Sequence, residues 1–305
     1  MRVLVTGASG WIGSAVIPEL IGAGHEVVGL ARSDAAARTV SSAGAEVLRG
    51  TIDDLDILRS AADASDGVIH LAFKHDLAFS GGFEAAAEAN QRAVDAIGEA
   101  LAGSDRPFTI ASGVLGLAPG RVAVEGAGLA PDEQALSGGP ALRLATARSM
   151  VALAPRGVRT SVVGLAPTIH GDGDHGFMAT LVAIARERGA AGYIGDGSQR
   201  WPAAHRLDAA RLFRLALEKA PAGSVLHGVA EEGVPLREVA EVIGRHLDLP
   251  VTSVAPEDAA AHFTWMASFL ALDSPASSAL TRELVGWQPM EPGLVEDLEK
   301  GHYFR

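Results

Sequence analysis

Short runs of branched apolar residues alternate with longer Ala-rich stretches of helical period along the first half of the chain. This alternation predicts βαβ units, in which helices connect the strands of a parallel sheet. The predicted strands span residues 3–6, 26–31, 46–48, 68–72, 108–112 and 160–165. The predicted helices between them span residues 11–23, 54–62, 83–101 and 141–154. Six strands in this order predict an α/β fold with a Rossmann-type doubly wound parallel sheet.

The order of the elements changes after Pro167. Helices are predicted for residues 177–188, 208–220 and 236–247, and short strands near residues 225–229 and 251–254. We therefore predict a dinucleotide-binding domain over residues 1–166. Residues 167–305 are predicted to form mainly a smaller α/β substrate-binding lobe, and the chain is free to re-enter the Rossmann domain near residues 200–230. The Gly-, Ala- and Pro-rich segment 113–139 is predicted to be a long loop beside the carboxyl edge of the sheet.

Composition narrows the class of protein further. The chain has 305 residues, no cysteine and a formal net charge of −12, with its basic residues scattered. A polyanion such as nucleic acid would be repelled, and neither a disulfide framework nor a thiolate metal site can form. The start of the chain lacks the pattern of a signal peptide, and no apolar run approaches the roughly 18 residues of a membrane span. We predict a soluble cytoplasmic protein with a small-molecule substrate and no nucleic-acid or membrane partner.

The strongest motif is the GxxGxxG spacing of residues 7–13, which leads from the first strand into a helix. Gly7 allows the tight turn, Gly10 lets main-chain N–H groups approach a pyrophosphate, and Gly13 lets the helix pack closely on the strand. The motif therefore predicts dinucleotide binding. Its predicted cofactor contacts are Gly7, Ser9, Gly10, Trp11, Ile12 and Gly13.

The end of the second strand indicates which dinucleotide binds. An acidic residue there would hold the ribose 2′-hydroxyl of NAD, whereas this chain has small Ala31 followed by Arg32 and Ser33. A guanidinium and a hydroxyl suit a 2′-phosphate. We therefore predict NADP(H) as the cofactor, with Arg32 and Ser33 as contacts. The alternative is that Arg32 is an ordinary solvated charge at a strand end.

Residues 6–13 resemble the fingerprint of the short-chain dehydrogenase/reductase superfamily, in the extended or atypical branch called the NAD-dependent epimerase/dehydratase family. Four further segments, at residues 50–52, 165–171, 205–210 and 285–289, are similar to motifs of the same family, as is His70-Leu71-Ala72. The family usually has an Asp where this chain has Thr51. The resemblance implies further cofactor contacts at Thr51, Ile52, Leu71, Ala72, Phe73, Ala111, Pro167 and Thr168.

The catalytic pattern of the family is incomplete in this chain. Family reductases use a Ser, a Tyr that acts as general acid, and a Lys four residues after the Tyr. Ser112 matches the Ser, but neither Tyr193 nor Tyr303 is followed by Lys at that spacing. The best register puts Arg143 at the Tyr position and Ala147 at the Lys position.

Protonation of the substrate then requires another group. The predicted catalytic residues are Ser112, Arg143 and His170, and His175 and Tyr193 are further candidates. Because an arginine hardly deprotonates in a protein, Arg143 is expected to stabilise charge or to anchor an anion rather than to relay a proton. The alternative is that Arg143 is a solvent-facing charge on its helix.

Three functions fit these residues. The first is an NADPH-dependent oxidoreductase that transfers a hydride to a small, fairly apolar carbonyl, imine or activated alkene. The second is an epimerase or dehydratase that keeps its nucleotide bound, and the third is an NADP(H)-binding regulatory protein without catalysis. A homodimer and a monomer are both compatible with the Ala-rich helices of the first half.

Other residues have plainer explanations. Asp53 and Asp208 are predicted to cap helices, and Trp287 to be part of a packed turn. The His- and Asp-containing run 170–176 is not predicted to bind metal, because its glycines do not hold the side chains on one face. Five aromatic or imidazole side chains either line an apolar substrate pocket between the lobes or pack in the core: Tyr193, Trp201, His262, Phe263 and Trp265.

Overall fold

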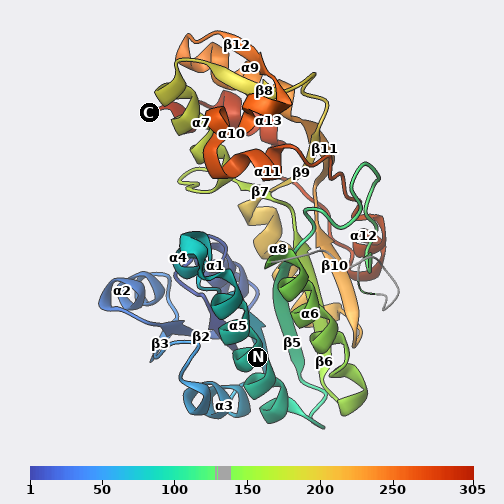
Figure 1. Ribbon diagram of the computed structural model, residues 1–305. Helices are drawn as coiled ribbons and strands as arrows, with labels where there is room; N and C mark the ends of the chain where they lie inside the picture. Colours follow the sequence, from blue (N-terminus) through green and yellow to red (C-terminus); the bar gives the residue numbers. More distant parts are fainter. Residues whose placement is uncertain (128, 130–138) are drawn as a thin grey trace.

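The computed structural model describes residues 1–127, 129 and 139–305. Its centre is a seven-stranded sheet with the order β10-β6-β5-β4-β1-β2-β3 (Figure 1). All six neighbouring pairs are parallel. The strands are β1 (Arg2–Thr6), β2 (Glu26–Ala31), β3 (Glu46–Arg49), β4 (Gly67–His70), β5 (Pro107–Gly113), β6 (Arg159–Leu165) and β10 (Ser224–Gly228). The predicted α/β fold class is confirmed.

Helices cover both faces of the sheet. One face packs against α3 (Leu55–Asp63), α5 (Phe83–Leu101) and α6 (Gly139–Val151). The other packs against α1 (Gly13–Gly22), α2 (Asp34–Ser42), α8 (Arg206–Lys219) and α12 (Ala279–Val285). Alternate residues of a strand point to opposite faces, so Leu4 joins the first core and Val3 and Val5 join the second. Burial on both faces explains why the strands are continuously apolar.

The structure contains elements that were not predicted. Helix α2 is one of them, and α1 begins at Gly13 rather than at residue 11 and continues through Pro18. The predicted strand 225–229 is β10, which pairs with β6 in the large sheet and lies in the stretch where the chain was free to re-enter the Rossmann domain. Most of the predicted loop 113–139 beyond residue 129 lies outside the described residues. In its described part, Ala123 forms a bridge with Ala276.

The chain enters the smaller lobe directly from the carboxyl end of β6 (Figure 1). The lobe contains two short sheets, β11-β9-β7 and β12-β8. Its elements are β7 (Thr168–His170), α7 (Phe177–Arg188), β8 (Ala191–Ile194), β9 (Arg200–His205), β11 (Glu231–Pro235), α9 (Leu236–Leu247), β12 (Val251–Val254), α10 (Ala259–Phe263), α11 (Ala267–Leu270) and α13 (Leu294–Glu299). The smaller lobe has its own hydrophobic core. Trp201 and Phe263 are buried in this core, so their role is packing.

Short helical turns complete the chain: α4 (His75–Leu77), η1 (Ala78–Gly82), η2 (Ala154–Arg156), η3 (Pro256–Asp258), η4 (Thr264–Met266) and η5 (His302–Phe304). In the described part of the chain, no helix has both the length and the apolar character that a bilayer crossing requires.

Asp208 has a different role from the predicted helix cap. It lies inside α8, where its carboxylate accepts hydrogen bonds from the main-chain N–H groups of Met290 (2.9 Å) and Glu291 (3.1 Å). The fully buried Trp287 donates its indole N–H to the Asp208 carbonyl at 3.0 Å, as expected of a packed turn. The capping prediction for Asp53 was also wrong, because the residue at the N-cap of α3 is Asp54.

Candidate active site

The glycine loop between β1 and α1 is packed too closely for larger residues. Gly7 has a φ of +66°, and a Cβ there would lie 2.7 Å from the main-chain nitrogen of Ala72. A Cβ on Gly13 would lie 2.1 Å from the Gly7 carbonyl oxygen. Because α1 begins at Gly13, the N–H groups of its first turn face the loop, where they suit an anion such as a pyrophosphate.

A buried hydrogen-bond network joins the end of β1, where the glycine loop begins, to β4 and α5. His70, at the end of β4, lies with Nδ1 2.8 Å from the Thr6 hydroxyl and Nε2 3.1 Å from the Asn90 amide oxygen. The Thr6 hydroxyl also accepts the Ala72 N–H at 3.2 Å. Together these bonds assign the proton to Nε2, with Thr6 donating to Nδ1. Burial, opposed by the Asn90 hydrogen bond and reinforced by the charge of Arg143, lowers the pKa of His70 to about 4, so the ring is neutral.

Two arginines lie at the predicted ribose end of the site. Arg32 follows β2 and pairs with Asp76 at 3.1 Å, and both side chains are largely exposed. Arg49 ends β3, where it lies beside Ala31 in the register of the two strands and pairs with Asp34. Ser33 caps α2 by accepting the Ala36 N–H at 3.2 Å. Arg49 was not among the predicted cofactor contacts. Its place at the end of the strand next to β2 is the feature that indicates this role.

The predicted adenine-side segment is held rigidly. Asp54 accepts hydrogen bonds from the N–H of Thr51 at 2.7 Å and from its hydroxyl at 2.9 Å, which lowers the pKa of the Asp54 carboxyl. Ile52 is buried. Asp53 pairs with Lys74 at 2.6 Å. These contacts fix the main chain of residues 51–52 at the carboxyl end of β3.

Arg143, on α6, lies beside the carboxyl end of β5 and is partly buried. Its guanidinium carbon stands 4.5 Å from the centre of the Phe73 ring, and Nη2 donates to the Ala111 carbonyl at 3.2 Å. Burial lowers the pKa of Arg143 to about 10, which still leaves the group charged at neutral pH. The alternative of a solvent-facing helix charge is wrong. The structure instead places a cation beside Ser112, the next residue on β5.

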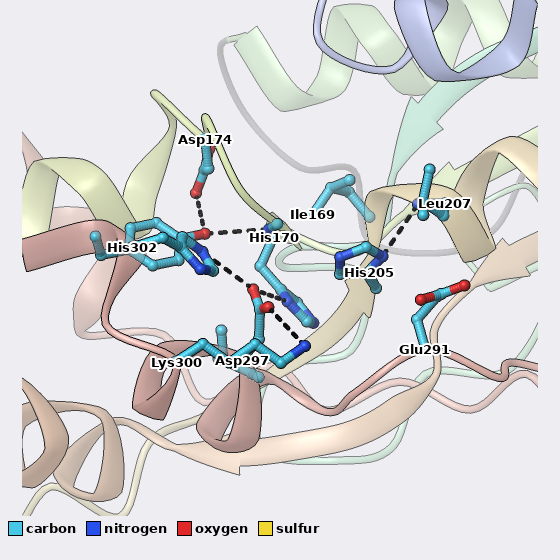
Figure 2. Close-up of polar contacts among 12 residues, drawn as sticks. Ile169, His170, Asp174, His205, Leu207, Glu291, Asp297, Lys300 and His302 are labelled. Atoms are coloured by element: carbon cyan, nitrogen blue, oxygen red, sulfur yellow. Dashed lines mark hydrogen bonds and ion pairs between the residues drawn. The ribbon is translucent and has the colours of Figure 1, made fainter. Parts of the chain in front are cut away.

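His170 lies elsewhere, in the smaller lobe. It is fully buried, and its Nδ1 is 3.0 Å from Asp297 on α13 (Figure 2). Burial raises the pKa of Asp297, but His170 and His302 beside it hold that pKa below its usual value. No hydrogen bond or ion pair between described residues joins His170 to Ser112 or Arg143. The contacts of the described residues bring Arg143 to Ala111, the residue before Ser112, and bring His170 to Asp297.

The His- and Asp-containing run 170–176 points its side chains apart. While His170 faces Asp297 (Figure 2), Asp174 accepts the Tyr303 hydroxyl at 2.8 Å and the Gly176 N–H at 2.7 Å. Burial raises the pKa of Asp174, although these two hydrogen bonds oppose the rise. The role of this run is to fasten the C-terminal turn to the loop after β7.

A pocket of about 120 Å³ lies between the glycine loop and the smaller lobe. Its lining includes Trp11 from the loop, Pro167 and Thr168 from the segment after β6, and His175 and Phe177. The Trp11 indole N–H donates to the Ile169 carbonyl at 2.8 Å, which ties the loop to β7. The Thr168 hydroxyl donates to the Pro202 carbonyl at 2.5 Å, so its proton is already engaged.

The family model for the NAD dependent epimerase/dehydratase family matches residues 3–227, which include the glycine loop, Arg143 and the seven-stranded sheet except the first residue of β1 and the last residue of β10. The chain belongs to the NAD-dependent epimerase/dehydratase family. Two relatives match it from end to end. The uncharacterized protein YLL056C of Saccharomyces cerevisiae is 45% identical over 99% of each chain, and the uncharacterized protein C2A9.02 of Schizosaccharomyces pombe is 43% identical over 100% of each.

Solved structures of the family have the same fold at lower identity. A UDP-glucose 4-epimerase from Thermotoga maritima, solved with UDP-glucose, is 19% identical with a TM-score of 0.76 and covers 100% of this chain and 98% of its own. The dTDP-glucose 4,6-dehydratase DesIV from Streptomyces venezuelae, solved with NAD, is 19% identical with a TM-score of 0.78 and covers 99% and 96%. Both likenesses are structural and extend through the smaller lobe.

The residues of this family member fit the nicotinamide dinucleotide for which the family is named. The glycine loop is a cradle in which a Cβ at Gly7 or Gly13 would collide with main-chain atoms. The loop also presents the start of a helix, where main-chain N–H groups can bind a diphosphate. In open α/β sheets, ligands bind at the carboxyl ends of the strands, which is where Ala72, Phe73, Ala111 and Ser112 lie.

Proposed function

We propose that the protein is an NADPH-dependent oxidoreductase that transfers a hydride to a small, fairly apolar carbonyl, imine or activated alkene. The observation that supports this proposal best is the placement of Arg143. A charged guanidinium that packs on Phe73 and bonds to Ala111 stands where the family's Tyr is expected, beside Ser112. Such a group stabilises negative charge on a substrate but does not donate a proton.

Bound NADPH would supply the hydride. The N–H groups of Arg143 that do not bond to Ala111 are available to the substrate oxygen, on which negative charge develops as its carbon is reduced. The Ser112 hydroxyl is a second donor at the end of β5 and positions the same oxygen. The proton then comes from water, because Arg143 keeps its own at neutral pH.

An epimerase or dehydratase cycle fits this site less well. Such a cycle begins with removal of a hydride and a hydroxyl proton, and the proton requires a general base. Arg143 does not act as a base near pH 7, and both nitrogens of His70 are already hydrogen-bonded. The residues therefore favour net reduction over an internal redox cycle.

Arg143→Met should lower kcat/KM for NADPH-dependent reduction about 100-fold, and Ser112→Ala about 10-fold, because each removes a donor to the developing charge. NADPH consumption over a panel of aldehydes, ketones and imines measures both effects. Arg237→Met, which removes an exposed arginine on α9, is the matched control and should leave the rate unchanged. Tight NADPH binding without turnover of any substrate would contradict the oxidoreductase and leave a binding protein.

The cofactor preference should depend on both arginines at the ribose end. Removal of a charge-assisted contact to the 2′-phosphate in Arg32→Ala or Arg49→Ala should weaken NADPH binding about 10-fold each and leave NADH binding unchanged. Calorimetric dissociation constants for both cofactors measure this. Arg59→Ala on α3 is the control, since Arg59 pairs with Asp56 and Glu99 away from the strand ends. Equal loss of NADPH and NADH affinity would assign the two arginines a structural role.

A further inference from the structure

Arg143, like Arg159 and Arg206, is a partly buried arginine that forms no ion pair with a carboxylate among the described residues. Arg211 and Arg214 on α8 each form ion pairs with two carboxylates, and the more exposed Arg200 pairs with Asp273. Among the described residues, the one hydrogen-bond acceptor of Arg143 is a neutral carbonyl, that of Ala111. Removing a charge from water without a counter-ion is costly, so a ligand that brings an anion would stabilise a group that has no counter-ion in the described part of the chain.

Two histidines extend from Arg143 toward the pocket between the lobes. His75 packs edge-on against the Phe73 ring at 5.1 Å, the same ring on which Arg143 lies. Burial first, and then the charges of Arg143 and His175, lower the pKa of His75, although Asp76 opposes them. His175 in turn lies 5.8 Å from Trp11 and lines the pocket between the lobes. A row of side chains, Phe73, His75 and His175, therefore leads from Arg143 toward that pocket.

The carboxylates nearest this row already have partners. Asp76 pairs with Arg32. Asp174, which also lines the pocket, accepts hydrogen bonds from Tyr303 and Gly176. Neither carboxylate forms an ion pair with Arg143 in the described part of the chain. The positive charge of Arg143 thus remains available to a bound molecule.

The other wall of the pocket is aromatic. Phe177 lines it, and the Phe177 ring centre lies 5.3 Å from that of Trp201, 5.9 Å from that of Trp265 and 5.7 Å from that of Phe269. Trp265 is 48% exposed, so this cluster reaches the surface. An apolar or aromatic body suits such a wall, whereas Arg143, which is not part of the pocket's lining, suits an anion.

We infer that the substrate is an apolar carbonyl compound with a carboxylate next to the reacting carbonyl, that is, a 2-oxo acid, and that Arg143 binds the carboxylate. This inference rests on the proposed function. The planar guanidinium can hold a carboxylate while it donates to Ala111, because its five N–H groups point in different directions. Reduction forms a C–H bond from the hydride, the π electrons of the carbonyl move to its oxygen, and that oxygen takes a proton from water to give a 2-hydroxy acid.

Calorimetry tests the anion site without any turnover. The protein saturated with NADP⁺ should bind 3-phenylpropionate about 100-fold more tightly than 3-phenylpropionamide, which has the same shape without the charge. Arg143→Met should abolish the difference, and Arg143→Lys, which keeps a charge but loses the fork, should retain part of it. Arg237→Met is again the control, and thermal unfolding checks that each variant is folded. Equal affinity for the acid and the amide would overturn the inference.

Turnover separates failure of this inference from failure of the proposed function. Phenylpyruvate should have a kcat/KM about 100-fold above that of 1-phenylpropan-2-one, and Arg143→Met should remove most of this ratio through KM. If both compounds are reduced equally well, the oxidoreductase stands and the anion site is wrong. If neither is reduced although 3-phenylpropionate binds through Arg143, the anion site stands and the oxidoreductase is wrong.

Discussion

Gly13→Ala should weaken binding of the dinucleotide at least about 100-fold and lower the free energy of unfolding by about 3 kcal/mol. The new Cβ would lie 2.1 Å from the Gly7 carbonyl oxygen and 2.9 Å from the Cα of Ala8, which are main-chain atoms of the loop that must meet the diphosphate. Helix α1 would have to move away from the loop, which costs packing energy and displaces the N–H groups at its start. Fluorescence titration with NADPH and urea unfolding measure the two effects.

Gly22→Ala is a control in the same helix. Gly22 ends α1, and a Cβ there would meet no atom within 4 Å. Because alanine favours the helix more than glycine does, this variant should gain about 0.5 kcal/mol and bind NADPH like the wild type. If Gly13→Ala also binds NADPH normally, the glycine loop is a structural turn and not the dinucleotide site.

The large sheet could be predicted because its central strands are apolar on both faces. Val3, Leu4 and Val5 show this, since they alternate between two separate cores and are all fully buried. Helix α2 was not predicted because it has few buried apolar residues. Only Val40 in it is buried, so residues 34–42 carry almost no apolar period. The sequence left the sheet of β10 open, because a short apolar strand does not show which sheet it will join.

The part of the candidate site that consists of neighbouring residues along the chain could be predicted from the sequence. Residues 7–13 form a cofactor loop through neighbours along the chain, and the spacing of their glycines is visible without a structure. Arg49 needed knowledge of the pairing between β2 and β3, which places it beside Ala31. The sequence placed Arg143 at the position of the missing Tyr but did not show that Phe73, 70 positions earlier, would cover it.

His170 shows the limit of motif reasoning. It follows a segment that resembles the family's nicotinamide loop, which made it a candidate proton donor. Its partner Asp297 is 127 residues away and belongs to α13, an element that the sequence did not predict. A histidine bound to a buried carboxylate fastens two segments together, and no local pattern distinguishes that role from catalysis.

Acid should destabilise the protein by up to about 3 kcal/mol through His70 alone. Its pKa is about 4 in the folded protein, chiefly because of burial, against an ordinary value of 6.5 in the unfolded chain. Between these values the unfolded chain binds the proton and the folded protein does not, so stability rises with pH from 4 to 6.5. Above pH 6.5 neither state is protonated, and His70 makes no contribution to the slope.

Urea unfolding from pH 4 to pH 8 measures this dependence, and His70→Asn isolates the part that belongs to His70. Burial is also the first cause that lowers the pKa values of His75, His205, His227 and His262, so the wild type should bind several extra protons on unfolding in acid.

His70→Asn should be less stable at pH 7, because the hydrogen bonds with Thr6 and Asn90 are disturbed. Its stability should nevertheless fall less steeply between pH 6.5 and 4, by about one proton. An unchanged slope in this variant would mean that His70 is protonated in the folded protein. The Thr6 hydroxyl would then have to turn away from Nδ1, and the network beneath the glycine loop would not have the arrangement described.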